Sequence, residues 1–266
     1  MSREATMKTK LKLVACMVAA LLGCHSADSP PLPKRVVDLT PVITPDLPVR
    51  HLGIRATEFL GIPERLDFAP IRPPNPGHSY GLVSYNLPSQ LGAHVDVPGR
   101  LLKSGARVDE IPLTRLIGPA KVLDLRWKDY NSPIQVSDLQ NYPIEKGDLV
   151  VLFVGYSPPA GPEWPRYPAL SSQAAQWLGG QGVAAVLTDA PSIGSYRRYE
   201  ELMTQGHQPE QVWAERLALF QAGIVIVEGI VNVGEILGER RVTMVALPLP
   251  IAERAGAPAR VVALVY

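Results

Sequence analysis

Hydrophobic residues in this chain gather in short runs that polar residues, glycines or prolines interrupt. Residues 121–127 and 149–155 are apolar at most positions, which is typical of strands buried on both faces. Similar runs, or an enrichment in β-branched residues, predict further strands over residues 36–43, 49–54, 80–85, 183–188, 224–227, 242–249 and 261–265. The pattern therefore predicts strands along the whole chain.

Helices are predicted only in the second half of the chain, where they alternate with the buried strands. Ser171 or Ser172 can cap a helix that ends near Gly179. The sequence Gln208-Pro209-Glu210 starts another helix, with proline at the first helical position and an acid in the first turn, and this helix ends at Gly223. This order of elements predicts an α/β fold with a mixed sheet or barrel-like core and flanking helices.

Two proline-rich segments interrupt this pattern. Residues 62–77 contain five prolines and are predicted to be a loop. Residues 157–168 follow a buried strand and carry Trp164 and Tyr167 among several prolines. Such a loop either covers a site or packs its aromatic residues onto the surface, and the sequence leaves both alternatives open.

Polar groups recur at every second position between Gln90 and Arg100. Side chains two apart along a strand point to the same face. One face of this segment would therefore carry Gln90, Gly92, His94, Asp96, Pro98 and Arg100. Neighbouring side chains on such a face lie roughly 6.5 Å apart, too far to share a small ion unless the strand bends, which its glycines and proline permit. The row predicts a site or the remains of one.

A second polar feature is Glu228, at the end of an apolar strand. Burying a carboxylate there is costly unless a positive charge compensates it. Arg216 lies at helical spacing from Val212, Trp213 and Phe220, on or beside the apolar face of the predicted helix. It is the obvious partner of Glu228, although its long side chain could instead extend along the surface to solvent.

The first two dozen residues are typical of an export signal. Four basic residues precede the apolar run 13–22, which is too short to span a bilayer. The run ends in Leu21-Leu22-Gly23-Cys24, which resembles a bacterial lipobox, with cleavage before Cys24 and a lipid on its thiol. An ordinary signal peptide with a chance cysteine is the alternative, and the small residue before Cys24 favours the lipoprotein. We expect a signal peptide over 1–23, a flexible tether over 24–35 and a single domain over 36–266.

On this interpretation the protein is an exported bacterial lipoprotein that faces the periplasm. The residue after the cysteine is His25 and not aspartate. This resembles the pattern of lipoproteins that are sorted to the outer membrane. Cys16 and Cys24 are the only cysteines, so the mature chain can form no internal disulfide, and lipidation of Cys24 leaves no thiol nucleophile or zinc–thiolate site.

The composition narrows the range of binding partners that we expect. With 266 residues, 46% of them hydrophobic, the chain can bury a sizeable core. Its formal net charge of +1 and the absence of a basic cluster give no support for nucleic-acid binding. The partners that we expect are a small molecule and, through the lipid, a membrane; a homo-oligomer is left open.

The row from Gln90 to Arg100 resembles the signature of the cyclase family, which includes bacterial kynurenine formamidases and isatin hydrolases. The family pattern reads His-x-Gly-Thr-His-x-Asp-x-Pro-x-His. In register with it are Gly92, His94, Asp96 and Pro98, whereas Gln90, Ala93 and Arg100 replace the first His, the Thr and the last His. Residues 108–125, 170–178, 188–193 and 222–229 also resemble the family, in the same order. The resemblance covers about residues 36–266 and implies the family's cyclase-like α/β fold.

The resemblance also implies a ligand set. In the family, the three histidines and the aspartate of the signature hold two divalent ions together with a later histidine and glutamate. The positions of these ligands correspond to Gln90, His94, Asp96, Arg100, Arg216 and Glu228, of which His94, Asp96 and Glu228 match. Arg100 and Arg216 replace the two histidines of the second ion, and a guanidinium offers no lone pair, so the second metal site is predicted to be absent.

One divalent cation is still compatible with the residues. Gln90 could bind it through the amide oxygen, together with His94, Asp96 and Glu228, and the candidates are zinc, manganese and magnesium. The amide is a weaker ligand for zinc than imidazole, and the two nearby guanidinium groups repel a divalent ion. The sequence therefore predicts at most one metal site.

The chemistry that the resemblance implies is hydrolysis of an amide, ester or lactam by metal-activated water, with the last signature histidine as general base. Arg100 stands at the position of that base. We therefore take His94 and Glu228 as the candidate catalytic residues. His78 and His207 are further candidates, but their positions are more typical of a surface loop and of a helix start.

Asp189 and Ser192 lie in a segment that matches a family element near the site. The alternative is a turn in which the serine hydrogen-bonds the backbone. We favour the turn.

The resemblance and the departures from it lead to two alternative functions. The first is a metal-dependent, arylformamidase-like hydrolase of a small amide, lactam or ester, which the resemblance implies. The second is a non-catalytic cyclase-fold lipoprotein that binds an anionic small molecule through Arg100 and Arg216, because paired guanidinium groups suit planar oxyanions. A hydrolase with a rebuilt single-metal or metal-free site is a third reading, and the departures from the signature argue for reduced or lost two-metal activity.

Overall fold

The computed structural model describes residues 31–72 and 81–266. Lys34–Val265 form one compact unit. The described residues outside it, 31–33 and Tyr266, carry no helix or strand. Within the described part of the chain, no helix is long and apolar enough to cross a membrane. The predicted signal segment and Cys24 lie outside the described residues.

Seven strands close into a barrel-like mixed sheet. They are β4 (His94–Asp96), β5 (Ile117–Asp124), β6 (Leu149–Phe153), β7 (Ala185–Thr188), β8 (Val225–Glu228), β9 (Val242–Pro248) and β10 (Gly256–Val265). Their order is β10-β4-β8-β7-β6-β5-β9, and β9 pairs with β10 to close the sheet. The four strands β5 to β8 run parallel, whereas the other neighbours are antiparallel. Strand β1 (Arg35–Asp38) pairs with β10 outside this ring.

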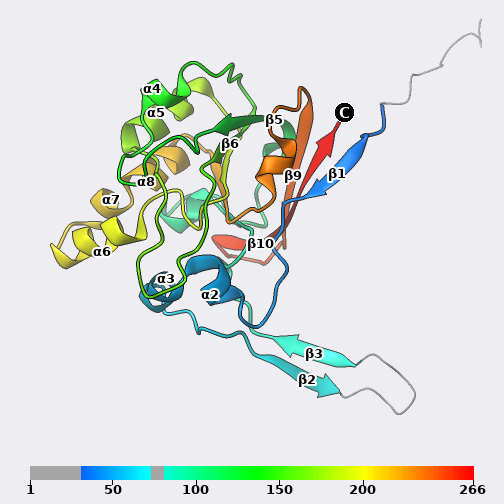
Figure 1. Ribbon diagram of the computed structural model, residues 1–266, viewed down its shortest axis with the longest axis vertical. Coiled ribbons are helices and arrows are strands. Elements are labelled where there is room, and N and C mark those ends of the chain that lie inside the picture. The colour runs from blue at the N-terminus through cyan, green and yellow to red at the C-terminus, as the bar shows by residue number, and fades with distance from the viewer. Residues whose placement is uncertain (1–30, 73–80) are drawn as a thin grey trace, which may run out of the picture. The chain divides into compact units, whose positions relative to one another are not determined.

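Helices flank the sheet. Figure 1 shows α4 (Val136–Leu139), α5 (Ser172–Gln181) and α8 (Ala214–Gln221) beside the parallel strands. The remaining helices are α2 (Leu47–Leu52), α3 (Ile54–Phe59), α6 (Tyr196–Thr204) and α7 (Pro209–Val212). Short 3-10 turns cover Pro98–Arg100, Leu113–Arg115 and Val233–Ile236. A separate two-stranded hairpin consists of β2 (Phe68–Arg72) and β3 (Leu82–Tyr85).

The alternation of side chains along the strands divides the apolar residues between two clusters. On β6, Leu149, Val151 and Phe153 belong to the cluster shared by the barrel strands, whereas Val150 and Leu152 belong to the cluster between sheet and helices. The helices α5 and α8 complete this second cluster with Ala174, Leu178, Leu219 and Phe220. Both faces of β6 are therefore buried, as its unbroken apolar run predicts.

The predicted α/β fold with a barrel-like core and flanking helices is confirmed. Ser171 caps α5 by accepting a hydrogen bond from the Ala174 N–H at 3.1 Å, and Pro209 opens α7. The single helix predicted to end at Gly223 is instead broken at Trp213, whose φ of −112° and ψ of 41° leave the helical region. The strand row predicted from Gln90 to Arg100 is shorter than expected, since only β4 is extended and a 3-10 turn follows it.

Two predictions for the first half of the chain are wrong. Residues 49–54 are not a strand but belong to α2 and α3, because Pro48 lies in the first turn of α2 and Gly53, with φ of 79°, separates the two helices. Residues 62–77 are not all loop, because β2 forms inside this segment and pairs with β3 alone, where a proline lacking an N–H is tolerated. Helix α6 was not predicted.

Candidate functional site

The antiparallel pairing of β4 with β8 builds the floor of the site. His94 lies directly opposite Glu228 in this pairing, and Asp96 lies one pleat further along β4. Val95 and Val227 point into the barrel cluster, so the polar residues between them point to the opposite face. His94, Asp96 and Glu228 are all buried, and this outward face lies beneath helix α8.

Arg216 extends from α8 to both carboxylates. Its Nη1 donates to Asp96 Oδ2 at 2.8 Å, and its Nη2 donates to Glu228 Oε1 and Oε2 at 2.5 and 2.8 Å. The same Nη2 donates to Ser192 Oγ at 2.8 Å. The Arg216 side chain is only 4% exposed, so the predicted pairing with Glu228 is present and the alternative of a solvent-exposed guanidinium is wrong.

Gln90 and Arg100 approach Asp96 from its other side. Gln90 Nε2 donates to Asp96 Oδ1 at 2.8 Å, and Arg100 Nη1 lies 3.5 Å from the same oxygen. The amide nitrogen of Gln90 therefore faces Asp96, and the predicted role of its oxygen as a ligand requires the amide to turn over. The Arg100 side chain is 30% exposed, so it is the one of the two arginines that solvent and ligands reach.

Charges in the buried site balance one another. Burial favours neutral Glu228, but Arg216 and His94 outweigh it and lower the pKa of this carboxyl to about 2. Burial likewise favours neutral His94, but Glu228 and Asp96 prevail and raise the pKa of the imidazole. His94 Nδ1 donates to the Gly92 carbonyl at 2.9 Å, and Nε2 lies 3.3 Å from Glu228 Oε2. With His94 protonated, two positive and two negative groups face each other.

These polar residues line a cavity of about 340 Å³. The six positions of the implied ligand set all reach it, namely Gln90, His94, Asp96, Arg100, Arg216 and Glu228. Most of its other lining residues are apolar or aromatic and include Phe59, Leu60, Ile62, Tyr196, Tyr199 and Trp213. The arrangement suits a small molecule with an apolar part and an anionic or hydrogen-bonding part.

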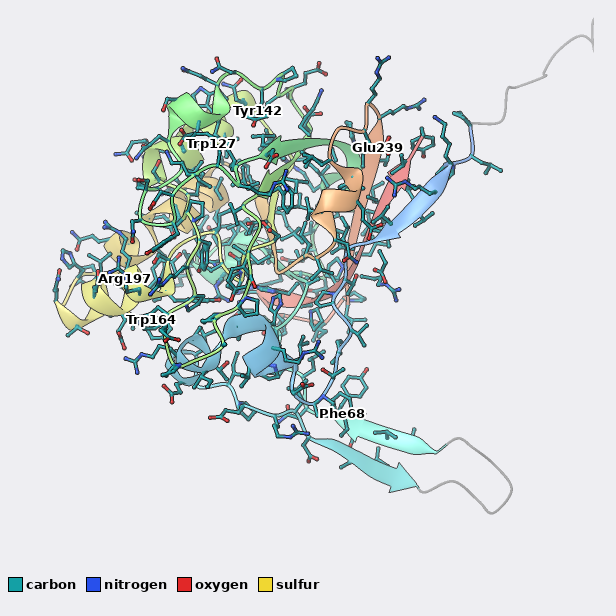
Figure 2. All side chains as sticks on the ribbon, viewed as in Figure 1. Phe68, Trp127, Tyr142, Trp164, Arg197 and Glu239 are labelled. Carbon is teal, nitrogen blue, oxygen red and sulfur yellow. The ribbon has the colours of Figure 1, made fainter. Side chains whose placement is uncertain are left out.

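The loop 157–168 packs its two aromatic residues onto neighbouring helices and turns. Trp164, labelled in Figure 2, stacks edge-on against Phe59 with ring centroids 5.5 Å apart. The Tyr167 hydroxyl donates to the Gly194 carbonyl at 2.8 Å. Because Phe59 lines the cavity, the loop supports the cavity wall from behind.

Of the other candidates from sequence, only Ser192 contacts this group, through Arg216. His207 is exposed, and His78 lies outside the described residues. The Asp189 carboxylate accepts the N–H groups of Val154 and Tyr156, each at 2.8 Å, and so connects two strand ends. Ser192 accepts from the Gly194 N–H at 3.2 Å, as the predicted turn requires, and also from Arg216.

Replacing Asp189 with asparagine is expected to lower the free energy of unfolding by about 1–3 kcal/mol, because an amide has one acceptor oxygen and one buried N–H group loses its partner. Urea denaturation measures this loss. Asp129→Asn is the control, since Asp129 accepts the Asn131 N–H in an exposed turn and should change stability little. An unchanged stability for Asp189→Asn would contradict the structural role.

Several residues near the site were not predicted from the sequence. His51 is buried, and burial together with the nearby His94 lowers the pKa of its imidazole to about 4, so it stays neutral. A β-carbon on Gly229, which has φ of 71°, would lie 2.5 Å from both His51 Nε2 and the Gly92 carbonyl oxygen, so only glycine fits directly after Glu228. The spacing of Tyr196 and Tyr199, three residues apart, was the available signal for the aromatic face of α6.

The described part of the chain contains one group of residues that could hold a metal ion. It consists of His94, Asp96 and Glu228, each of which offers a donor atom within 4.8 Å of the others. These are the three residues that match the ligand set implied by the resemblance. Comparison with known proteins agrees with the geometry, because the family model Cyclase matches residues 37–195, more than half of the chain.

The chain belongs to the cyclase family. A kynurenine formamidase of Salinibacter ruber is 31% identical to this cyclase over 189 residues, which cover 69% of this chain and 80% of the relative. A kynurenine formamidase of Erythrobacter litoralis is 26% identical over 225 residues, 83% of this chain and 89% of the relative. The homology therefore extends over most of both sequences.

Solved structures share the fold of this chain. Isatin hydrolase A from Labrenzia aggregata superimposes with a TM-score of 0.69 at 21% identity and covers 87% of this chain and 93% of its own. A protein described as a predicted metal-dependent hydrolase from Bacillus stearothermophilus gives a TM-score of 0.60 at 24% identity, covering 86% and 97%.

Proposed function

We propose that this cyclase is an arylformamidase-like hydrolase of a small amide, lactam or ester that holds at most one divalent cation. The observation that supports it is the buried group His94, Asp96 and Glu228, with donor atoms within 4.8 Å of one another beside a cavity of about 340 Å³. Relatives named kynurenine formamidase align over most of the chain. The substrate class that the name of those relatives indicates, N-formylkynurenine, is a candidate for this chain.

The donor set fits a single cation. One imidazole nitrogen and two carboxylates suit zinc, manganese or magnesium, and Gln90 could add an amide oxygen after its side chain turns over. A second ion has no comparable donor set, because Arg100 and Arg216, which offer no lone pair, replace the two histidines that the resemblance implies for it. Arg216 and Arg100 also repel further positive charge.

Each polar residue has a role in this proposal. When bound, the cation would polarise the substrate carbonyl and lower the pKa of a water molecule. In the metal-free site, His94 Nε2 and Glu228 Oε2, 3.3 Å apart, hold a proton between them. Glu228 orients the His94 imidazole through this contact and offers a carboxylate oxygen to the cation. Arg100, at the exposed side of the cavity, binds an anionic group of the substrate.

A non-catalytic ligand-binding protein is the second candidate, and one observation favours it. Arg216 pairs with Asp96 and Glu228, and protonated His94 supplies the second positive charge, so the buried charges balance in the protein without any metal. The Nη1 and Nη2 groups of Arg216 donate to Asp96, Glu228 and Ser192. Arg100 is therefore the main contact for an anionic ligand. The two candidates therefore differ in their need for a metal.

Metal content and hydrolysis distinguish them. We expect the full chain, purified without chelator and then exposed to zinc, manganese or magnesium, to contain no more than one ion per chain by elemental analysis. Asp96→Asn should lose that ion together with hydrolysis of N-formylkynurenine, isatin or an aryl ester. Asp124→Asn is the matched control, because Asp124 pairs with Arg126 at an exposed position far along the chain.

Two ions per chain would contradict the single-site proposal, and so would hydrolysis that Asp96→Asn leaves unchanged. A folded, ion-free protein that hydrolyses none of these substrates would overturn the enzymatic function and support the second candidate.

We also propose that the chain is an exported lipoprotein anchored by Cys24, facing the periplasm from the outer membrane, with a signal peptide over 1–23, a tether over 24–35 and one domain over 36–266. The support is the sequence alone: basic residues, a short apolar run and a small residue before the cysteine. Radiolabelled palmitate incorporation that a Cys24→Ser variant abolishes would support the anchor.

A further inference from the structure

Glu215 on α8 is a buried acid that the candidate site does not use. The residue is 9% exposed, and its Oε1 accepts a hydrogen bond from the Tyr199 hydroxyl. In the described part of the chain, no lysine, arginine or histidine nitrogen lies within ion-pair distance of this carboxylate. The neighbouring Arg216 directs its guanidinium to Asp96 and Glu228 instead. Because a buried charge without a partner is costly, a bound positive group would stabilise the protein at Glu215.

Glu215 lines a second cavity, of about 390 Å³. Tyr199 is the one residue that lines both this cavity and the candidate site. A β-carbon on Gly194 would overlap Tyr199 Oη and Glu215 Oε1, so glycine at this position allows the pair to pack against the main chain. Burial raises the pKa of the Glu215 carboxyl, and a cation beside it would keep it ionised.

The rim of the second cavity carries the opposite charge. Arg197, labelled in Figure 2 on α6, and Arg198 both line the cavity and are exposed. Arg197 Nη1 lies 3.6 Å from Glu201 Oε1, whereas no carboxylate among the described residues is within ion-pair distance of Arg198. Other parts of the wall are apolar or aromatic, such as Leu170 and Tyr130. The cavity therefore combines a negative interior, a positive rim and an apolar wall.

We propose that this second cavity binds a free amino acid with an apolar side chain, its ammonium group against Glu215 and its carboxylate against Arg198. A simple amine would be repelled by the arginines at the rim, and a simple carboxylate would be repelled by Glu215. A molecule that carries both charges pairs with both groups, and its apolar part packs on Leu170 and Tyr130. The binding does not depend on the proposed hydrolysis.

Isothermal titration of the full chain with L-phenylalanine tests the proposal. Glu215→Gln should weaken binding at least about tenfold, because the ammonium group loses a buried charged partner. The glutamine keeps an oxygen that accepts from Tyr199, so the fold should be retained, which circular dichroism checks. Arg198→Ala changes an exposed side chain, cannot disturb the core, and should weaken binding several-fold. It keeps the test decisive if Glu215→Gln does not fold.

Two comparison ligands and one variant serve as controls. 2-Phenylethylamine lacks the carboxylate and 3-phenylpropionate lacks the ammonium group, so each should bind at least about tenfold more weakly than L-phenylalanine. Arg100→Ala should leave the affinity for L-phenylalanine unchanged, because Arg100 lines the candidate site and not the second cavity.

Three results would overturn the proposal. The first is no binding of L-phenylalanine at millimolar concentration, and the second is an affinity that neither Glu215→Gln nor Arg198→Ala lowers. The third is a loss of binding in Arg100→Ala as large as in Glu215→Gln, which would place the amino acid in the candidate site instead. Equal affinity for either comparison ligand would exclude recognition of both charges.

Discussion

Replacing Arg216 with alanine is expected to lower the free energy of unfolding by about 3–5 kcal/mol, because it leaves buried charge without a partner. Asp96 and Glu228 are buried within a few ångströms of each other, and Arg216 donates to both. Without it, one carboxylate must take up a proton or admit water. Urea denaturation of the full chain measures the loss as a lower midpoint at constant slope.

Two further variants serve as a conservative replacement and as a control for this prediction. Arg216→Lys keeps the charge but loses the fork geometry, so it should retain part of the stability. Arg260→Ala removes an exposed arginine that also contacts an aspartate, Asp38, through two hydrogen bonds, and it should change stability little. If Arg216→Ala were as stable as the wild type, the charge balance argued for the site would be wrong.

Restoring the three histidines that the family resemblance implies, at positions 90, 100 and 216, is expected to raise the metal content from at most one ion to two ions per chain. In the variant Gln90→His, Arg100→His and Arg216→His, two guanidinium groups that repel cations are replaced by imidazoles that bind them. Asp96 and Glu228 lose their hydrogen bonds to Arg216, so their carboxylate oxygens would be available as ligands. Elemental analysis and isothermal titration with zinc or manganese measure the change.

The same variant should hydrolyse N-formylkynurenine or an aryl ester about a hundredfold or more faster than the wild type, since Lewis-acid stabilisation is worth several kcal/mol. Adding Asp96→Asn to the three histidines is the control and should abolish both the second ion and the gain in rate. A triple variant that stays folded but binds no more metal than the wild type would show that the arginines are not what excludes the second ion.

The chemistry of the site could be predicted from the sequence because its residues lie in two short segments with recognisable spacing. The alternation from Gln90 to Arg100 placed His94 and Asp96 on one face, and Glu228 stood out as an acid ending an apolar run. The barrel strands were recognisable for a similar reason, since an unbroken apolar run such as 149–153 is buried on both faces.

Local propensity failed where tertiary contacts decide. The β-branched residues of 49–54 favoured a strand, yet the segment is helical and brings His51 beside His94. Pro70 argued for a loop, yet the hairpin tolerates it because it pairs on one side only. Neither outcome can be read from a window of a few residues.

The fold class could be predicted from the sequence because hydrophobic periodicity is a local property, and the resemblance to the cyclase signature supplied the family and the groups that meet at the site. How these groups interact depends on tertiary packing. The β4–β8 register sets His94 against Glu228, and helix α8 brings Arg216 between Asp96 and Glu228 across 120 residues of sequence. Whether Arg216 extends to solvent or pairs with two buried carboxylates depends on that packing, because burial sets the free-energy cost of an unpaired charge.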